Sequence, residues 1–387
     1  MKQAQRFLIL IFIASARIAD GQTYSVGVQT VTYIDSSRSN RSIAVEVHYP
    51  ATANGASTPF ASDSFPFVVF GHGFVMTASC YYPFSDTLAT RGYIFAFPTT
   101  ESSPSPSHAD FAKDLIFVHN KLISESSNPG SPLYQHVRAA GAIGGHAMGG
   151  GCTVLSAQYG NPALCYFTFA EATTNPSSIT AAPSMTKPYL SFSGSYDCIA
   201  PYTTNQLPTY DSSGSPCKYL IEVTGASHCQ WGVSNAACNL GESLSSCASP
   251  PLSQAAQINT GLAYLEPYLD HYLKGQASSL VSFDSVYTAD QGSTKTKSCG
   301  VAPNGIRGIS TLQASLYPNP ANDIVYIQAD NNISSMSVMD YTGKVVMQRE
   351  LNSQTINLNV AALSSGIYLV EITANNGERS EMKFAKD

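Results

Sequence analysis

A series of short apolar runs separated by helical patterns constrains the fold of this chain more than any other feature. Runs such as 67–70 (FVVF), 165–169 (CYFTF) and 189–193 (YLSFS) are almost wholly apolar, as strands are when both faces of their sheet are covered. The two earliest runs alternate in part, as half-exposed antiparallel strands do. Together the patterns predict eight strands, at 24–33, 42–49, 67–70, 93–97, 140–144, 165–169, 189–193 and 218–223.

Helical patterns lie between these runs. The clearest begins at Ser107, which is followed three residues later by Asp110 and then by apolar residues at helical spacing, as in a capping box. We therefore interpret His108 and Asp110 as helix-start residues and not as catalytic groups. Further helices are expected after Met148 and over 253–273. This alternation predicts an α/β fold with an eight-stranded, mostly parallel sheet that is covered by helices on both faces.

The amino-acid composition of the sequence changes after residue 275. Residues 276–312 are rich in Ser, Thr and Gly, and we interpret them as the edge of the first domain followed by a linker. Five short alternating segments then predict a small, separate all-β sandwich over 313–387. These segments are 324–330, 335–348, 355–360, 366–373 and 381–387.

The first 21 residues have the form of a signal peptide. Lys2 and Arg6 supply positive charge, 7–16 is a ten-residue apolar run, and Ala19–Gly21 precede the expected cleavage point. A membrane anchor is the alternative, but a spanning helix needs ~20 apolar residues. The domain prediction is thus a signal peptide (1–21), a main domain (22–275), a linker (276–312) and the sandwich (313–387).

Charge and cysteine content narrow the function classes. The formal charge of −6 argues against nucleic acid and against an anionic membrane surface as partners, and we expect an exported monomer. Nine cysteines favour disulfides in such a protein, with at least one thiol left over. Cys238 and Cys247, nine residues apart, are expected to staple a loop. Zinc is the alternative, but no CxxC or HExxH motif occurs, so we expect no metal and no cofactor.

The segment GGHAMGG (144–150) has the form of a sharp strand-to-helix turn. Gly145, His146, Met148 and Gly149 surround Ala147, the position at which such a turn presents a catalytic nucleophile. That position therefore holds a methyl group in place of the expected serine hydroxyl.

Two further groups follow in the order that a nucleophile–acid–base triad needs. Asp197 ends one expected strand and His228 follows the next, 50 (197 − 147) and 31 (228 − 197) residues on. Asp197 would orient His228, which would act as general base and then acid. The backbone N–H groups of Met148 and of Phe74, in GHGF, would form the oxyanion hole. His72 and His146 are interpreted as structural.

These pieces resemble the α/β-hydrolase superfamily, in its dienelactone-hydrolase-, chlorophyllase- and polyester-hydrolase-like branch. The matching segments are GHGF, GGHAMGGG, GSYDCIAP and GASHCQW, within 24–275. The resemblance implies hydrolysis of carboxylic esters through an acyl-enzyme. In polyester hydrolases of this type a disulfide can tie the Asp loop to the His loop, which implies Cys198–Cys229, with Cys198–Cys217 as the alternative.

Ala147 departs from the family pattern, in which serine stands here. Loss of the nucleophile costs on the order of 10⁶ in kcat in a serine hydrolase, so the chain is expected to be nearly inactive. An engineered change and a natural loss both explain the alanine. A surface protein that binds ligands in the old cleft is the alternative to an enzyme scaffold, and amide cleavage is a third possibility.

The expected site is open, because the 17 residues 171–187, between the strand that ends near Ala170 and the one that starts near Pro188, leave no room for a large cap. An open site suits a bulky or polymeric ester. Phe74 and Trp231 could flank the cleft, although Trp231 could equally pack under the His loop. Polyester hydrolases often carry a Trp where this chain has Glu171 and Ala172, which argues against an aromatic polyester.

The C-terminal module resembles the sorting domain of Bacteroidota type IX secretion cargo. The matching segments are LYPNPA (316–321), MDYTGK (339–344), LSSGIY (363–368) and KF (383–384). The resemblance implies the type IX secretion machinery as a partner, passage through the periplasm of a Gram-negative bacterium and usually cleavage of the module, leaving a secreted or cell-surface protein. A carbohydrate-binding sandwich is the alternative.

Overall fold

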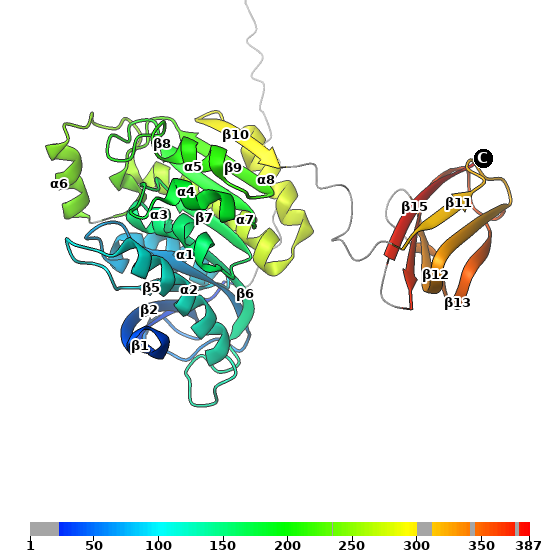
Figure 1. The fold of residues 1–387 in the computed structure, drawn as a ribbon, viewed down its shortest axis with the longest axis horizontal. Helices are drawn as coiled ribbons and strands as arrows, with labels where there is room; N and C mark the ends of the chain where they lie inside the picture. The colour runs from blue at the N-terminus through cyan, green and yellow to red at the C-terminus, as the bar shows by residue number, and fades with distance from the viewer. Residues whose placement is uncertain (1–22, 234, 300–311, 341–344, 376–378) are drawn as a thin grey trace, which may run out of the picture. The chain divides into compact units, whose positions relative to one another are not determined.

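The structure is a computed structural model of the 387-residue chain. It describes residues 23–233, 235–299, 312–340, 345–375 and 379–387. The chain divides into two compact units, Met1–Gly300 and Val301–Asp387 (Figure 1). The expected signal peptide lies outside the described residues.

The sheet of the first unit has ten strands, two more than the sequence predicts. All eight expected strands are present with shifted ends, and the short β3 and the longer β10 extend the two edges. The strands are β1 (Ser25–Asp35), β2 (Arg41–Ala51), β3 (Gly55–Ala56), β4 (Phe65–Gly71), β5 (Ile94–Pro98), β6 (Val137–His146), β7 (Cys165–Phe169), β8 (Tyr189–Gly194), β9 (Cys217–Val223) and β10 (Ser293–Cys299).

The strand order places the ends of several strands at one edge of the sheet. The order is β10-β9-β8-β7-β6-β4-β5-β2-β1-β3. The strands from β9 to β5 are parallel, whereas β2 and β10 pair antiparallel to β5 and β9. Because the carboxyl ends of parallel strands meet at the same edge, the loops after β4, β6, β8 and β9 come together there.

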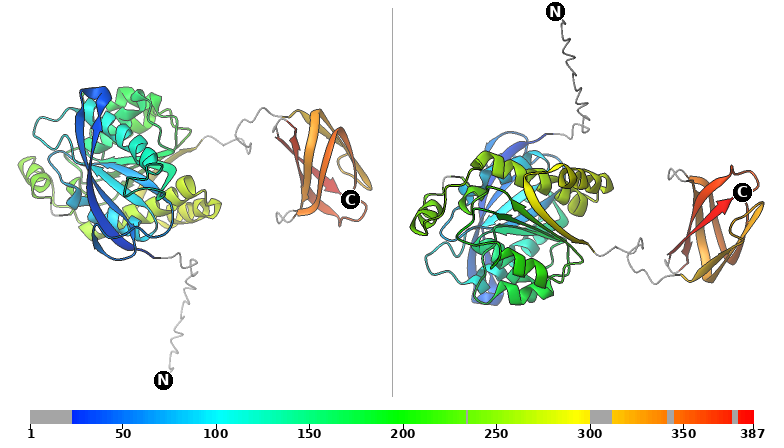
Figure 2. Two further views of the ribbon diagram at one scale, coloured as in Figure 1. Left: turned by 90° about the horizontal axis from the view of Figure 1, so that it is seen from below. Right: turned by 90° about the horizontal axis from the view of Figure 1, so that it is seen from above.

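Alternating residues of the central strands feed two separate cores. In β4, Val68 and Phe70 face one helical layer, while Phe67 and Val69 face the other. Helices α1, α7 and α8 cover the first face, and α2, α3 and α4 cover the second, as the views in Figures 1 and 2 show. Burial on both faces explains why these runs are apolar throughout.

The predicted helix starts are present. Ser107 caps α2 by accepting a hydrogen bond from the Asp110 N–H at 3.2 Å, and Ser253 caps α7 in the same way. The helices are α1 (Tyr82–Thr90), α2 (His108–Glu125), α3 (Met148–Leu155), α4 (Ser178–Ala181), α5 (Gln206–Ser212), α6 (Ala236–Leu244), α7 (Gln254–Lys274) and α8 (Ala277–Ala289). Across the residues that the structure describes, no helix is both long and apolar enough to cross a membrane.

The predicted linker begins too early. Residues 277–289 form α8, whose Phe283 is buried against Tyr219, and 293–299 form β10 beside β9. The strand escapes sequence analysis because its residues, STKTKSC, are polar and only partly covered at the sheet edge. The first unit therefore runs to Gly300.

The expected disulfides are wrong in every pairing. The structure pairs Cys198 with Cys247 and Cys229 with Cys238, not Cys198 with Cys229 and not Cys238 with Cys247. Cys217 pairs with Cys299, its register partner on β10, and not with Cys198. The unexpected strand thus supplies one partner, whereas Cys238 lies within α6 and Cys247 lies just beyond it. The unpaired cysteines are Cys80, Cys152 and Cys165, all buried.

The second unit is a single antiparallel sheet over one apolar core, where the sequence predicts a sandwich. The expected segment 324–330 and the first part of 335–348 are continuous in β12, whereas 345–348 begin β13, which also contains most of the expected segment 355–360. β11 is an additional strand. The strand order is β11-β12-β14-β15, with β13 on β12. The strands are β11 (Ala314–Tyr317), β12 (Ile324–Met339), β13 (Val345–Asn359), β14 (Gly366–Ala374) and β15 (Arg379–Lys386).

The two disulfides that close the longest and the shortest loops are expected to differ in their effect on stability. Cys217–Cys299 spans 82 residues and Cys229–Cys238 spans nine. Loop-closure entropy predicts losses of about 4.5 and about 2.6 kcal/mol in the free energy of unfolding when each pair is replaced by two serines. Urea unfolding of the two double variants measures the difference. Equal losses would contradict the entropic explanation.

Candidate active site

Ala147 lies at the sharp turn between β6 and α3. Its backbone has φ 50° and ψ −116°, a positive φ that a residue with a Cβ adopts only at a cost. Three backbone hydrogen bonds hold this conformation. The Ala147 N–H donates to the Phe169 carbonyl at 3.0 Å, and the Ala147 carbonyl accepts from the N–H groups of Gly151 and Ala172 at 2.9 Å. The expected turn is formed, with a buried methyl group at its centre.

Glycines around the turn permit a very close approach of backbone segments. A Cβ on Gly149 would lie 2.1 Å from the Gly71 carbonyl oxygen, and one on Gly145 would lie 2.4 Å from the Gly149 carbonyl carbon. On Gly151 it would lie 2.0 Å from the Ala172 carbonyl oxygen. No Cβ fits at such distances, so the start of α3 can sit against β4 and the end of β7 only with glycine at these positions.

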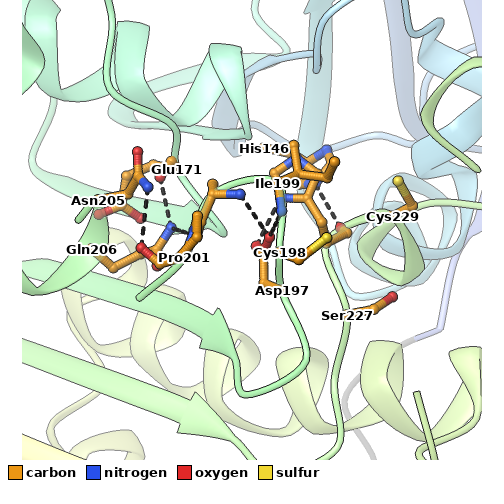
Figure 3. A network of polar contacts seen from close by, with 12 residues as sticks. His146, Glu171, Asp197, Cys198, Ile199, Pro201, Asn205, Gln206, Ser227 and Cys229 are labelled. Carbon is orange, nitrogen blue, oxygen red and sulfur yellow. Dashed lines mark hydrogen bonds and ion pairs between the residues drawn. The ribbon is translucent and has the colours of Figure 1, made fainter. Parts of the chain in front are cut away.

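Asp197 and His228 meet at the carboxyl edge of the sheet. His228 Nδ1 donates to Asp197 Oδ2 at 2.7 Å, and Asp197 Oδ1 accepts from the N–H groups of Ile199 at 2.9 Å and Ala200 at 2.7 Å (Figure 3). Both side chains of the pair are buried. The His228 ring centroid is 5.0 Å from that of His146, the neighbour of Ala147. The carboxylate thus fixes the imidazole beside the turn and leaves Nε2 as the nitrogen that can take up a proton.

The loop after β4 contains a strained turn. The Met76 N–H donates to the Gly73 carbonyl at 3.0 Å, which closes a turn around Phe74 and Val75. Val75 has φ 54°, which is rare for a β-branched residue. Strained residues cluster at sites where the chain must hold a backbone group in a set direction. The candidate N–H donor, Phe74, lies inside this strained turn, and the other, Met148, is the first residue of α3, whose first N–H groups have no partner within the helix.

The two aromatic residues expected to flank the cleft differ in exposure. Phe74 is 50 % exposed, so it can contact a ligand. Trp231 is fully buried, and its ring stacks on Phe169 at 4.8 Å and contacts Phe192. Trp231 is therefore a core residue beneath the His loop, and its expected role as a wall of the cleft is wrong.

His72 and His146 are both buried, as structural residues are. The ring nitrogens of His72 lie 2.9 Å from the carbonyl oxygens of Gly73 and Thr100. Those of His146 lie 2.9 Å from the Tyr81 hydroxyl and 3.0 Å from the His228 carbonyl oxygen. Burial lowers the pKa of His72 and holds the pKa of His146 well below its usual range, so His146 is neutral.

A family profile described as PET hydrolase-like matches residues 16–246, more than half of the chain. The chain belongs to the PET hydrolase-like family. A second profile, described as a secretion system C-terminal sorting domain, matches residues 315–386. This tail makes the chain a secreted or cell-surface protein. Among curated proteins, none matches the chain.

Helix α6 braces the site of this PET hydrolase-like domain from outside. Cys198 follows Asp197 and is joined to Cys247, beyond α6, while Cys229 follows His228 and is joined to Cys238, within α6. The Cys229 N–H also donates to Glu242 of the helix at 3.0 Å. The helix buries none of its own residues and projects from the body of the domain in Figures 1 and 2. The Asp and His loops are therefore tied to one another through α6.

Glu171, which the sequence marks only as lacking the Trp of polyester hydrolases, is a buried acid. It follows β7, and its carboxyl group accepts hydrogen bonds from the hydroxyls of Thr168 (2.7 Å), Tyr189 (2.8 Å) and Ser191 (3.0 Å). Burial raises its pKa to about 7. Its Cβ would lie 2.7 Å from a Cβ placed on Gly150, so it packs directly under α3. Glu171 is thus part of the packing beneath the turn.

Gly149→Ala is expected to lower the free energy of unfolding by about 3 kcal/mol, the upper end of typical overpacking costs. The added methyl group would collide with backbone atoms of Gly71 and His72, which cannot rotate away. Gly241→Ala is the matched control, because a Cβ there meets nothing within 4 Å and alanine favours the helix. Denaturant unfolding measures both. A neutral Gly149→Ala would show that α3 can move away from β4.

Glu171→Gln is expected to remove a pH dependence of stability. A folded pKa of about 7, above the model-peptide value of 4.5, means that the fold favours the protonated acid. Below about pH 4.5 the acid is protonated in both the folded and the unfolded chain, so its burial carries no ionisation cost. The free energy of unfolding then falls as the pH rises to about 7. Relative to the parent chain, the Gln variant should gain about 3 kcal/mol between pH 4.5 and pH 8. Denaturant unfolding across this range tests it, with the exposed Asp211→Asn as control. Parallel curves for parent and Gln variant would contradict it.

Proposed function

We propose that the chain is a carboxylic-ester hydrolase scaffold of the acyl-enzyme type, with alanine at the position of its nucleophile. One observation carries this proposal. The hydrogen-bonded pair of Asp197 and His228 lies beside a strand-to-helix turn whose central residue, Ala147, has the strained backbone of a nucleophile position. Membership of the PET hydrolase-like family supports ester hydrolysis as the reaction.

A serine at position 147 would complete the following mechanism. His228 Nε2 takes the proton of the hydroxyl as its oxygen attacks the ester carbonyl carbon. The N–H groups of Met148 and Phe74 stabilise the negative oxygen of the tetrahedral intermediate. His228 then gives the proton to the leaving alcohol, and water repeats the cycle to release the acid. Asp197 holds the imidazole and stabilises its cation.

Ala147 interrupts this sequence at the first step. A methyl group cannot attack a carbonyl, and loss of a serine nucleophile costs on the order of 10⁶ in kcat. Cys152 offers no substitute, because burial raises the pKa of its thiol far above its ordinary value and its sulfur faces the His108 carbonyl oxygen. The chain is therefore nearly inactive as an esterase.

The substrate proposed for the restored site is a bulky or polymeric ester. Only the short α4 and a 3₁₀ turn lie between β7 and β8, which supports an uncapped site. Exposed Phe74 offers an apolar contact at one side. Glu171 is turned into the interior and Ala172 has only a methyl group, so this loop presents no aromatic ring to an aromatic polyester.

The whole chain is proposed to be an exported monomer. The signal peptide (1–21) leads it to the periplasm of a Gram-negative bacterium, and the sorting domain carries it across the outer membrane through the type IX secretion machinery. In this arrangement the hydrolase domain extends to Cys299, where β10 ends.

A non-catalytic binding protein is the second candidate. One observation favours it. Position 147 lacks the serine oxygen that would react, while Asp197 and His228 remain hydrogen-bonded to each other. A protein of this kind would bind an ester or glycan in the old cleft without turning it over.

Ala147→Ser is expected to raise the hydrolysis of p-nitrophenyl esters by on the order of 10⁶ over the chain as it stands. Esters of graded acyl length should be compared, together with an anilide that reports amide cleavage. Ala157→Ser, in the 3₁₀ turn Ser156–Tyr159 that follows α3, adds the same hydroxyl away from the turn at Ala147 and should leave the rate unchanged.

A folded Ala147→Ser variant without turnover would overturn the enzyme proposal and leave the binding protein. Addition of His228→Ala to the active serine variant should return the rate to near its starting value, because the base is then lost. High turnover by the unmodified chain would contradict the assigned position of the nucleophile.

A further inference from the structure

A buried chain of hydrogen bonds joins three loops of the candidate site through two side chains outside the triad. The Gly73 N–H donates to the Tyr81 hydroxyl at 2.9 Å, and this hydroxyl lies 2.9 Å from His146 Nδ1. His146 Nε2 in turn lies 3.0 Å from the carbonyl oxygen of His228. Tyr81, His146 and His228 are all nearly inaccessible to solvent. The chain thus runs from the loop after β4, across the end of β6, to the loop after β9.

The direction of each bond follows from the chemistry of its partners. A carbonyl oxygen can only accept, so His146 Nε2 carries the hydrogen. In the neutral ring Nδ1 is then an acceptor, and the Tyr81 hydroxyl must donate to it. The lone pairs of that hydroxyl remain for the Gly73 N–H. The Met76 sulfur, 3.2 Å from the same hydroxyl, is a weaker acceptor beside it. The donor and the acceptor of every hydrogen bond in this series are therefore determined.

The bond to Gly73 acts on the part of the loop that needs support. Gly73 immediately precedes Phe74, whose N–H is a candidate oxyanion donor, and the next residue, Val75, is held at φ 54°. A Cβ on Gly73 would lie 2.6 Å from the Met76 sulfur and 3.0 Å from His146 Nδ1, so the loop sits directly on these side chains. Tyr81 itself comes from the buried 3₁₀ turn Ala78–Tyr81.

We propose that Tyr81 and His146 are positioning residues, which hold the Phe74 N–H and the His228 loop in fixed relation to the turn at Ala147. This inference rests on the proposed ester hydrolysis. Neither side chain touches the reacting atoms. Their effect on rate comes from keeping the oxyanion donor pointed at the place where negative charge develops, which matters more in the transition state than in substrate binding.

The test uses full-length chain carrying Ala147→Ser, with Tyr81→Phe added. Phenylalanine keeps the ring and removes the hydroxyl, which leaves the Gly73 N–H without its acceptor. We expect kcat to fall about 10- to 100-fold with little change in KM, as for a weakened oxyanion donor.

A boronic acid supplies a readout that a merely structural role would not change. The introduced serine oxygen adds to the boron as its proton passes to His228, and the tetrahedral adduct places a negative oxygen toward the N–H donors. Its inhibition constant should rise by the same factor by which kcat/KM falls, while the affinity for the carboxylic acid product stays constant.

Tyr268→Phe is the matched control, because Tyr268 is also buried and its hydroxyl donates to a single backbone carbonyl, that of Tyr166, at 3.0 Å. It should lower thermal stability and leave kcat and the boronic acid constant unchanged. If Tyr81→Phe behaves in the same way, the positioning role is overturned although the enzyme proposal stands. An inactive but folded Ala147→Ser parent would overturn the enzyme proposal, and this inference with it.

His146→Gln gives a second, independent variant. The amide can still donate toward the His228 carbonyl but offers no acceptor at the position of Nδ1. If the two side chains act as one chain of bonds, the double variant with Tyr81→Phe should be no slower than the slower single variant. If the rate losses of the two single variants multiply in the double variant, the two side chains act separately, which would overturn the proposed linkage. The same variant carries the kinetic test should Tyr81→Phe fail to fold.

Discussion

The contact between the first turn of α3 and the end of β4 is the constraint on which the rest of the site depends. Backbone meets backbone there, with Gly149 against Gly71 at a distance that excludes any side chain. This contact brings the turn at Ala147 next to the loop of Gly73 and Phe74, so two candidate N–H donors come from segments that are far apart in sequence. The strained φ angles of Ala147 and Val75 lie on either side of this contact. The packing of two short segments therefore brings together the two N–H groups that we propose as the oxyanion hole.

The sequence allows prediction where the signal is local. The central strands are apolar on both faces, and Ser107 and Ser253 mark helix starts, so these elements are found close to their observed bounds. The order of Ala147, Asp197 and His228 is also readable, because parallel strands bring their carboxyl ends to one edge. Motif spacing then identifies the pair that the structure joins by a hydrogen bond.

The errors concern features that depend on three-dimensional proximity. Cys217 pairs with Cys299 because β10 lies in register beside β9, and nothing in the polar sequence of β10 indicates that strand. Cys198 and Cys229 each follow a residue of the pair, yet they bond to Cys247, just beyond α6, and to Cys238, within α6, and not to each other. Trp231 could be placed either in the cleft or in the core, and only its contact with Phe169 decides for the core. Glu171 gains its significance from three hydroxyls that come from β7 and β8.

The position of β10 also determines what happens to an incomplete chain. Until residues 293–299 are added, β9 is an edge strand with free backbone N–H and C=O groups, and Cys217 has no disulfide partner. Such an edge is a template for pairing with another chain. A fragment cut at residue 246, where the family match ends, would expose this edge and also lose Cys247. The motifs of the candidate site all lie before that point, but the strand that covers the edge of the sheet lies after it, between that point and the sorting domain in the sequence.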